Sequence, residues 1–292
     1  MNVQTKICRK QTDSAYAAAD SGLVLHLADR DIRTSRPAFV MGIVNATPDS
    51  FWQGSRGGAE HALQLVEEGA DILDIGGESS RPGSDYVDSD EEIRRIVPVI
   101  REVRRRSSCP ISVDTRKLAV MQAAYDEGAD IVNDISALED EPALAEFAAA
   151  KKLPVILMHK RGIPAIMQKN TAYDDVFAEV SGYLERRAEF ALSCGVDPDR
   201  IIVDPGIGFG KDMAANIRLI KDCGQLCGGR FMVLMALSRK TCIGDMTGCP
   251  VQERLYGTLA ADMVAVQAGA SMVRVHDVKA AVDTLHVLSY LS

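Results

Sequence analysis

The sequence has little of the chemistry that binds zinc or crosslinks secreted domains. Its 292 residues include 7 cysteines and 5 histidines, with no CxxC motif and no cluster rich in either residue. The cysteine number is odd and the positions are scattered, so we expect reduced thiols that serve as small apolar side chains. A zinc site is not expected. The cysteines are Cys8, Cys109, Cys194, Cys223, Cys227, Cys242 and Cys249.

Long apolar segments are also missing. No run approaches the roughly 18 residues that span a membrane. The basic residues Lys6, Arg9 and Lys10 are not followed by the apolar core of a signal peptide. The net charge of -8 makes nucleic acid and anionic membrane surfaces poor partners. We therefore expect a cytoplasmic protein that binds neither nucleic acid nor membranes.

What the sequence does contain, from residue 39 onward, is a regular alternation of two patterns. Helical spacing of apolar residues occurs at 60–69, 91–106, 117–128, 142–152, 174–195 and 252–269. Short apolar runs separate these segments, and each run ends in a polar or Gly-rich cluster. The runs are FVMGIVN (39–45), DILDIGG (71–77), ISVD (111–114), DIVND (130–134), VILMH (155–159), IIVD (201–204), MVLMALS (232–238) and MVRVHD (272–277).

This alternation predicts an α/β fold with parallel strands. An open doubly wound sheet is the alternative. Eight runs, with no Gly-rich dinucleotide fingerprint after the first, favour a (β/α)8 TIM barrel, which typically needs about 250 residues. We expect the barrel over residues 37–292. Residues 1–36 form a short N-terminal extension, in which the alternation at 22–32 suggests a small hairpin.

Polar side chains collect where the predicted strands end, which in a barrel is the rim that carries active sites. Asp114, Asn133 and Asp204 suit the edges of a flat heterocycle. Cationic groups suit a phosphorylated ligand. The cationic candidates are Arg81, Lys240, Arg274 and His276, and the other polar strand ends are Asn45, Glu78, Asp134, His159, Ser238 and Asp277. For Asp277 alone, a helix N-cap is an equally good interpretation.

Two segments at this rim are long for connections after a strand. Residues 46–58 and 77–92 are rich in Gly, Ser and Pro. They are predicted to be lids over the rim, with inert insertions as the alternative. Mg²⁺ held by one or two protein oxygens and a pyrophosphate is compatible with Asn45 and nearby acidic residues.

Eight motifs over residues 39–288 resemble the dihydropteroate synthase family in order and spacing. They are NATPDSF (45–51), DIGGESSRPG (74–83), ISVDT (111–115), ADIVNDIS (129–136), VILMHKRG (155–162), DPGIGFGK (204–211), SRKTCIG (238–244) and VRVHDV (273–278). The resemblance implies a folate-biosynthesis enzyme that condenses 6-hydroxymethyl-7,8-dihydropterin pyrophosphate with p-aminobenzoate. The products would be 7,8-dihydropteroate and pyrophosphate. It also implies Mg²⁺, sulfonamides as inhibitors and a homodimer.

The resemblance further implies residue roles. Catalytic groups would be Asp114, Lys240 and Arg81. The pterin would be bound by Asp114, Asn133, Asp204 and Lys240, and the pyrophosphate and Mg²⁺ by Arg274, His276 and Asn45. The resemblance places Ser80 and Arg81 in the second long loop. Around p-aminobenzoate it places Phe51, Pro82, Phe209 and Thr241.

Besides Ser80, where Thr is usual, and Thr241, where Ser is frequent, the sequence departs from the family pattern at two places. Trp52 and Gln53 follow Phe51 where Ser-Asp is usual, and Ala236–Leu237 precedes the SRK block, where a Gly is common. Two alternatives therefore stay open. One is a pterin-binding paralogue with little or no activity. The other is a corrinoid-type methyltetrahydrofolate methyltransferase, which would need neither Arg274 and His276 nor the segments 79–82 and 238–240.

Overall fold

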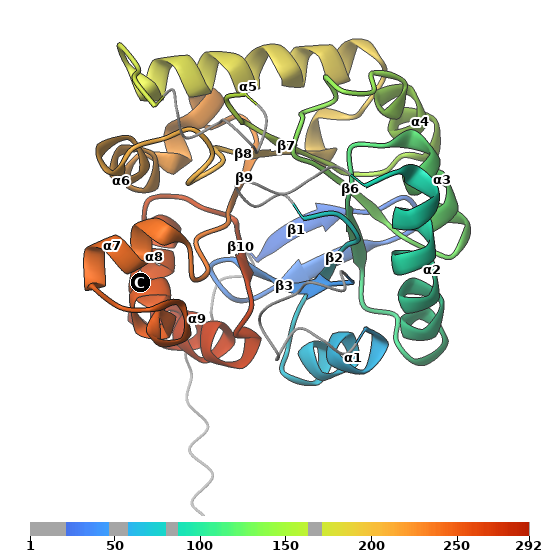
Figure 1. Ribbon diagram of the computed structural model, residues 1–292, viewed down its shortest axis with the longest axis horizontal. Coiled ribbons are helices and arrows are strands. Elements are labelled where there is room, and N and C mark those ends of the chain that lie inside the picture. Colours follow the sequence, from blue (N-terminus) through green and yellow to red (C-terminus); the bar gives the residue numbers. More distant parts are fainter. Residues whose placement is uncertain (1–21, 47–57, 80–86, 163–170, 292) are drawn as a thin grey trace, which may run out of the picture.

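Eight parallel strands form a closed barrel at the centre of the molecule (Figure 1). The structure, a computed structural model, describes residues 22–46, 58–79, 87–162 and 171–291. The strand order around the barrel is β10-β3-β4-β5-β6-β7-β8-β9, so each predicted run supplies one strand and the predicted TIM barrel is confirmed. The strands are β3 (Phe39–Asn45), β4 (Ile72–Gly76), β5 (Ile111–Asp114), β6 (Ile131–Asp134), β7 (Val155–Met158), β8 (Ile201–Asp204), β9 (Met232–Met235) and β10 (Met272–Val275).

Helices surround the barrel. Each predicted helical range overlaps one α-helix of the structure. These helices are α1 (Ala59–Glu67), α2 (Ser89–Arg106), α3 (Leu118–Asp126), α4 (Ala143–Lys151), α5 (Val176–Ser193) and α8 (Leu255–Gln267). None of the predicted helical ranges covers α6 (Met213–Lys221), α7 (Thr241–Thr247) or α9 (Val278–Leu291). Short 3₁₀ segments are η3 (Pro198–Arg200), η4 (Cys223–Gly229) and η5 (Val251–Glu253). In the part of the chain that the structure describes, no helix combines the length and the apolarity needed to cross a membrane.

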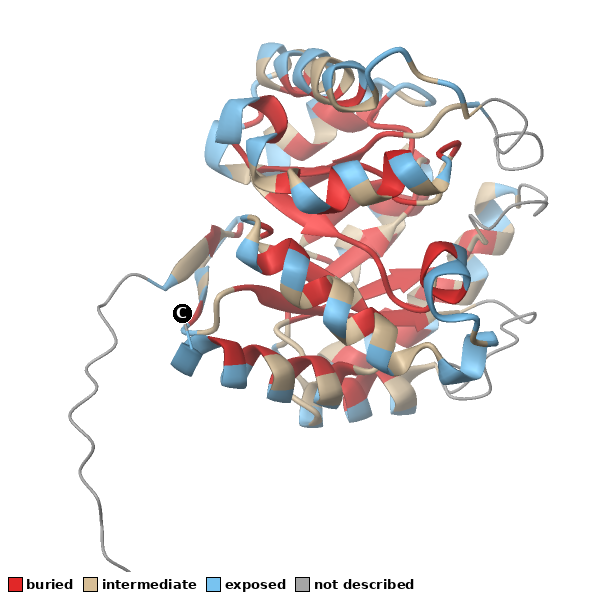
Figure 2. Cartoon of the chain, turned by 90° about the vertical axis from the view of Figure 1, so that its left-hand side faces the viewer, coloured by how far each residue is buried: buried red, intermediate tan, exposed pale blue. Residues whose placement is uncertain are grey.

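The strands are buried on both faces, which explains their continuous apolar sequences (Figure 2). Alternate residues belong to different cores. In β4, Leu73 and Ile75 pack in the cluster between barrel and helices, whereas Ile72 packs inside the barrel. The barrel interior is filled from the strand starts by Phe39, Met41, Ile72, Ile131, Ile156, Ile202, Leu234 and Met272.

An antiparallel hairpin closes the barrel at the end where the strands begin. Its strands β1 (Leu23–His26) and β2 (Asp31–Thr34) pair from Leu23↔Thr34 to His26↔Asp31. Leu25 and Leu27 belong to the same apolar cluster as the barrel interior. The hairpin therefore acts as a plug for the barrel base. The domain boundary at residue 37 stays a prediction.

Replacing Leu25 by alanine should destabilise the protein by roughly 2–5 kcal/mol, the range for a buried leucine that leaves a cavity. Leu25 is 0% exposed in the plug. Urea denaturation will measure the change. Val24→Ala, at a half-buried position on the same strand, is the matched control and should cost less. Equal losses for both variants would contradict the plug. Because the plug is remote from the rim, kcat of folded Leu25→Ala should stay near that of the parent protein.

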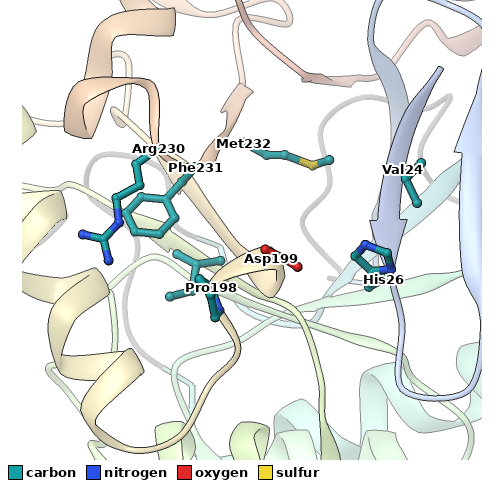
Figure 3. Close-up of a pocket in the computed structure, with 8 residues that line it drawn as sticks. Val24, His26, Pro198, Asp199, Arg230, Phe231 and Met232 are labelled. Atoms are coloured by element: carbon teal, nitrogen blue, oxygen red, sulfur yellow. The ribbon is translucent and has the colours of Figure 1, made fainter. Parts of the chain in front are cut away.

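A cavity of about 280 Å³ lies beside the hairpin at this same end (Figure 3). It is bounded by Val24 and His26 of β1 and by Ile201 and Met232, which open β8 and β9. Pro198, Asp199, Arg230 and Phe231 complete the lining. Since it lies where strands start, the cavity is separate from the rim.

An unpaired carboxyl group is buried on the inner face of α8. Asp262 is 3% exposed, and neither carboxyl oxygen has a hydrogen-bond partner among the described residues. Burial raises the pKa of Asp262 well above its usual range. A raised folded-state pKa means that this group's contribution to stability is fully present at acidic pH and is lost as pH rises through that pKa.

Asp262→Ala should therefore raise the melting temperature, and by more at pH 8 than at pH 5. Removing an unsatisfied buried polar group is expected to gain about 1–3 kcal/mol. Thermal melts of both proteins at the two pH values provide the measurement. A lower melting temperature for the variant at pH 8 would show that Asp262 has a partner that stabilises its charge.

Candidate functional site

The barrel interior changes from apolar to polar along each strand. Asp74 follows Ile72 by two residues, so the two side chains lie on the same face of β4. The same spacing relates Arg274 to Met272, Asn133 to Ile131 and Asp204 to Ile202. An apolar layer at the base thus carries a polar layer above it, at the carboxyl ends of the strands.

An ion-pair network forms the centre of the polar layer. Arg274 donates from Nε to Asp74 Oδ2 at 2.6 Å and from Nη2 to Asp114 Oδ2 at 3.0 Å. Asn133 Nδ2 donates to the same Asp74 oxygen at 3.1 Å. Three strands and the closing strand β10 are joined by these contacts, so the predicted residues Asp114, Asn133 and Arg274 do meet at one place.

Two atoms of this layer lack partners. Asp74 Oδ1 and Ser112 Oγ are buried and make no hydrogen bond to the described residues. Asp74 and Ser112 are register neighbours on β4 and β5, and both residues are 0% exposed. Unsatisfied buried acceptors are rare because each costs free energy. Their presence under the mouth indicates a place where a ligand or water donates hydrogen bonds.

The carboxyl groups of this layer are hard to ionise. Burial raises the pKa of Asp114 to about 7, with Arg274 opposing the shift and Asp74 adding to it. Burial also raises the pKa of Asp204, which Lys240 opposes. The pKa of Lys240 falls to about 8 for the same reason. Asp114 is therefore poised to change charge near neutral pH, which is typical of functional groups.

Lys240 and the segment after β8 form a second part of the mouth. Lys240 Nζ donates to the carbonyl oxygen of Ile207 at 2.5 Å and lies 4.9 Å from the centre of the Phe209 ring. Asp204 Oδ1 accepts from the backbone N–H of Gly206 at 2.7 Å. An aromatic wall beside a cation suits a planar aromatic ligand with a negative group.

His276 and Asn45 stand at the ends of β10 and β3, which are neighbours in the barrel. Ser238 Oγ accepts from the His276 backbone N–H at 3.1 Å and contacts His276 Nδ1 at 2.9 Å. Because a hydroxyl group can both donate and accept, Ser238 Oγ can pair with Nδ1 in either neutral tautomer of the imidazole, and the contact fixes the orientation of the ring. Asn45 is half-buried, and Thr241 is exposed at the first position of α7.

Several polar strand ends have structural partners. Asp134 accepts from the Ser136 and Leu138 backbone N–H groups, and Asp277 forms a bidentate pair with Arg239. These groups stabilise connections behind the rim. Glu78 and His159 are likewise held by Lys117 and Lys211.

Some predicted site residues cannot be placed. Phe51, Ser80, Arg81 and Pro82 lie outside the described residues, as do Trp52 and Gln53. Most of the first predicted lid (46–58) and residues 80–86 of the second (77–92) lie outside the described residues, whereas residues 89–92 of the second belong to the start of helix α2. Their roles stay predictions.

Asp74 is the residue that the sequence analysis overlooked. It is the only charged residue inside the apolar run ILDIG of β4. Side chains two positions apart on a strand point to the same face, so Asp74 must face the barrel interior as Ile72 does. The alternation of the strand therefore indicated an inward-facing carboxyl group at position 74. Its partner Arg274 is 200 positions away, which only the fold reveals.

No group of three or more His, Cys, Asp or Glu side chains arranged to hold a metal occurs among the described residues. Asn45 offers one oxygen at the rim, and the carboxylates of the inner layer are engaged with Arg274. This donor set does not form a protein cage for a metal. It fits a hard cation that a phosphorylated ligand carries with it.

Comparison with known proteins agrees with this geometry. The model of a family described as pterin binding enzyme matches residues 41–276. The dihydropteroate synthase of Neisseria meningitidis serogroup B is 46% identical over 259 residues, which cover 85% of this chain and 90% of that protein. The chain therefore belongs to the pterin-binding enzyme family, and within it to the dihydropteroate synthases.

Solved structures show the same fold. A dihydropteroate synthase of Xanthomonas albilineans, solved with 4-aminobenzoic acid, has a TM-score of 0.85 and 43% identity and covers 93% of this chain and 98% of its own. The Yersinia pestis enzyme in a sulfonamide complex has a TM-score of 0.86 and 36% identity, covering 92% and 99%. Both relatives span nearly the whole described chain.

Proposed function

We propose that this chain condenses 6-hydroxymethyl-7,8-dihydropterin pyrophosphate with p-aminobenzoate to give 7,8-dihydropteroate and pyrophosphate. The observation that carries the proposal is the Asp74–Arg274–Asp114 network at the barrel mouth, with unpartnered buried acceptors beside it. Family membership supports the same reaction.

The pterin fits the inner layer. A pterin ring has amine and amide N–H donors beside carbonyl and ring-nitrogen acceptors. Asp114, Asp204 and Asp74 Oδ1 supply acceptors, while Asn133 and Lys240 supply donors. Buried polar groups of this kind reject rings that lack the matching edge, because the unmatched groups would stay unpaired.

The pyrophosphate fits the outer positions. Nε and Nη2 of Arg274 are used by carboxylates, so Nη1 is the donor that remains for an anion. His276 Nε2 and the Asn45 side chain lie at neighbouring strand ends. Mg²⁺, when bound to the pyrophosphate, would neutralise negative charge on the leaving group, and Asn45 would supply its protein oxygen.

The chemistry then needs no enzyme nucleophile. The bond between the methylene carbon and the pyrophosphate oxygen breaks, and its electron pair leaves with the pyrophosphate. The positive charge spreads into the pterin, where the Asp114 carboxylate stabilises it. The p-aminobenzoate nitrogen forms the new bond and releases a proton to solvent. Phe209 and Thr241, with Phe51, Pro82, Ser80 and Arg81 of the undescribed segments, would surround this second substrate.

A direct assay separates this function from its alternatives. The purified protein should release pyrophosphate only when Mg²⁺, the pterin pyrophosphate and p-aminobenzoate are all present, and a sulfonamide should compete with p-aminobenzoate. Pterin binding without turnover would identify an inactive paralogue. Methyl transfer from methyltetrahydrofolate to a corrinoid, with no pyrophosphate released, would identify the methyltransferase.

We also propose that the protein is a homodimer that uses the outer face of α7, α8 and α9. These helices are neighbours in the fold (Figure 1). They expose large apolar side chains that a monomer rarely gathers. The exposed residues are Met246, Tyr256, Val264, Val287, Tyr290 and Leu291. A second copy of the same surface would cover them through a two-fold axis.

Tyr256→Glu combined with Tyr290→Glu should convert the dimer to a monomer in sedimentation velocity. These tyrosines are 81% and 86% exposed, so the monomer should still fold. Gln122→Glu, exposed on α3, is the control that should keep the dimer. An unchanged dimer in the double variant would refute this interface.

A cytoplasmic location is proposed as well. Every cysteine in the described part of the chain is free, including the half-buried Cys109, Cys194 and Cys249. Free thiols persist in a reducing compartment. Fractionation of the native host, probed with an antibody against the chain, tests the location.

A further inference from the structure

Lys211 is a buried cation that the proposed reaction does not use. The residue is 3% exposed. Its Nζ lies 2.9 Å from Gly206 O, 3.0 Å from Phe209 O and 2.9 Å from His159 Nδ1. Three acceptors at these distances match the three protons of an ammonium group. Lys211 therefore ties the end of β7 to both ends of the segment 206–209.

The backbone around this ammonium allows little adjustment. Gly206 has φ +66°, and a Cβ there would lie 1.9 Å from the carbonyl oxygen of His159. The His159 N–H in turn donates to the Asp204 carbonyl at 3.0 Å. The segment after β8 is thus pressed against the end of β7, and only glycine permits that approach at position 206.

His159 serves this contact in its neutral form. Burial lowers the pKa of His159 to about 3, and the positive charge of Lys211 contributes. Nδ1 accepts from the ammonium, so the ring proton is on Nε2. Burial lowers the pKa of Lys211 as well, to about 7, with Asp204 opposing the shift. The three contacts of Lys211 Nζ, with the His159 ring as one acceptor, make this pair an anchor for the segment 206–209.

The anchored segment carries two groups of the mouth. The Ile207 carbonyl accepts from Lys240 Nζ, and the Phe209 ring lies beside the same ammonium. Tyr173 Oη also donates to the Gly210 carbonyl at 2.9 Å. The carbonyls of residues 206, 207, 209 and 210 are all bound by side chains, and Lys211 binds two of them. The positions of the Phe209 ring and of the Lys240 ammonium group therefore depend on the contacts of Lys211.

We propose that Lys211 is a positioning residue for the aromatic amine substrate: by fixing the Gly206 and Phe209 carbonyls against His159, it sets the wall on which p-aminobenzoate is held. This inference rests on the proposed function, in which Phe209 lines that substrate's site. The inner layer of Asp74, Asp114 and Asn133 has no contact with Lys211 and should keep its geometry.

The test compares Lys211→Met, which removes every donor, with Lys211→Gln, which keeps an N–H donor. Lys221→Met, exposed on the following helix α6, is the matched control. In Lys211→Met the KM for p-aminobenzoate should rise about 10-fold or more, because small displacements of a positioning wall cost that much. It should rise more than the KM for the pterin pyrophosphate, with kcat little changed. Lys211→Gln should be intermediate and Lys221→Met normal.

Histidine NMR checks the anchor independently of turnover. In the parent protein the His159 ring should stay neutral, with its proton on Nε2, below pH 5, whereas Lys211→Met should raise its pKa. If Lys211→Met does not fold, the KM for p-aminobenzoate and the His159 pKa measured on Lys211→Gln provide the test. A folded variant with an unchanged KM for p-aminobenzoate overturns the proposal, as does a loss confined to kcat. A parent protein without synthase activity would instead refute the proposed function, while the NMR result would still report on the anchor.

Discussion

Replacing Arg274 by alanine is expected to lower kcat/KM about 10²-fold or more, the scale for removing one preorganised transition-state donor. Arg274 is the cation between Asp74 and Asp114, and its remaining Nη1 donor is the group proposed for the leaving pyrophosphate. The variant loses that donor and also the positive charge that keeps Asp114 ionisable. Both losses act on the step in which the pyrophosphate departs.

A second consequence separates this explanation from simple loss of binding. Arg274 opposes the rise in the pKa of Asp114 that burial causes. Without the guanidinium, the pKa of Asp114 should rise further. If the Asp114 carboxylate is the active form, kcat/KM increases with pH through this pKa, and in the variant that increase should occur at higher pH. Leaving two carboxyl groups unpaired should also destabilise the fold by about 3–5 kcal/mol.

Steady-state rates measured from pH 5 to 9 on the folded variant test these expectations. Arg274→Lys is the matched control, because it keeps one charge but cannot bridge two carboxylates. Compared with Arg274→Ala, Arg274→Lys should regain more of the free energy of unfolding than of kcat/KM. A kcat/KM of folded Arg274→Ala close to that of the parent protein would contradict the proposed role of the network.

The sequence was sufficient for the barrel because its strands are continuous apolar runs with polar ends. Helices were harder. α7 has 7 residues with Gly244 among them, which is too short for a periodic signal. In α9, by contrast, Val278, Ala281, Val282 and Leu285 are buried at helical spacing, so its pattern was readable and was overlooked.

The site was predictable in outline and not in its pairings. Residue type and strand-end position brought Asp114, Asn133 and Arg274 together. The same criterion selected Asp134, whose oxygens are used by Ser136 and Leu138. A polar residue at a strand end faces the barrel interior only if it is an even number of positions away from an apolar residue that faces inward. Asn133 and Asp134 differ by one position and hence lie on opposite faces.

Partners at long range could not be predicted at all. Arg239 and Asp277, 38 positions apart, form a structural pair inside two motifs that otherwise point to ligands. His159 is committed to Lys211 across 52 positions. One sequence provides no information on which of several cations meets which carboxylate, since that depends on the closure of the barrel.

Asp114→Asn should lower kcat/KM about 10²- to 10³-fold, since an amide is isosteric but cannot stabilise a developing cation. The parent protein should show the cause in its pH profile. With the pKa of Asp114 raised to about 7 by burial, kcat/KM should fall about tenfold for each pH unit below that value and level off above it. The carboxylate is the active form, so activity increases with pH.

Stability should move in the opposite direction. A folded-state pKa above the unfolded value of about 3.9 means that the folded protein binds the proton more tightly. This contribution is fully present below about pH 4 and is lost as pH rises through about 7. Asp114→Asn has no proton to lose at this position, so the inflection near pH 7 should disappear from its pH profile of kcat/KM, and its melting temperature should fall less between pH 4 and pH 7 than that of the parent protein. If the variant kept the inflection in kcat/KM, another group would be titrating, and Asp114 would not be the residue that sets the charge of the mouth.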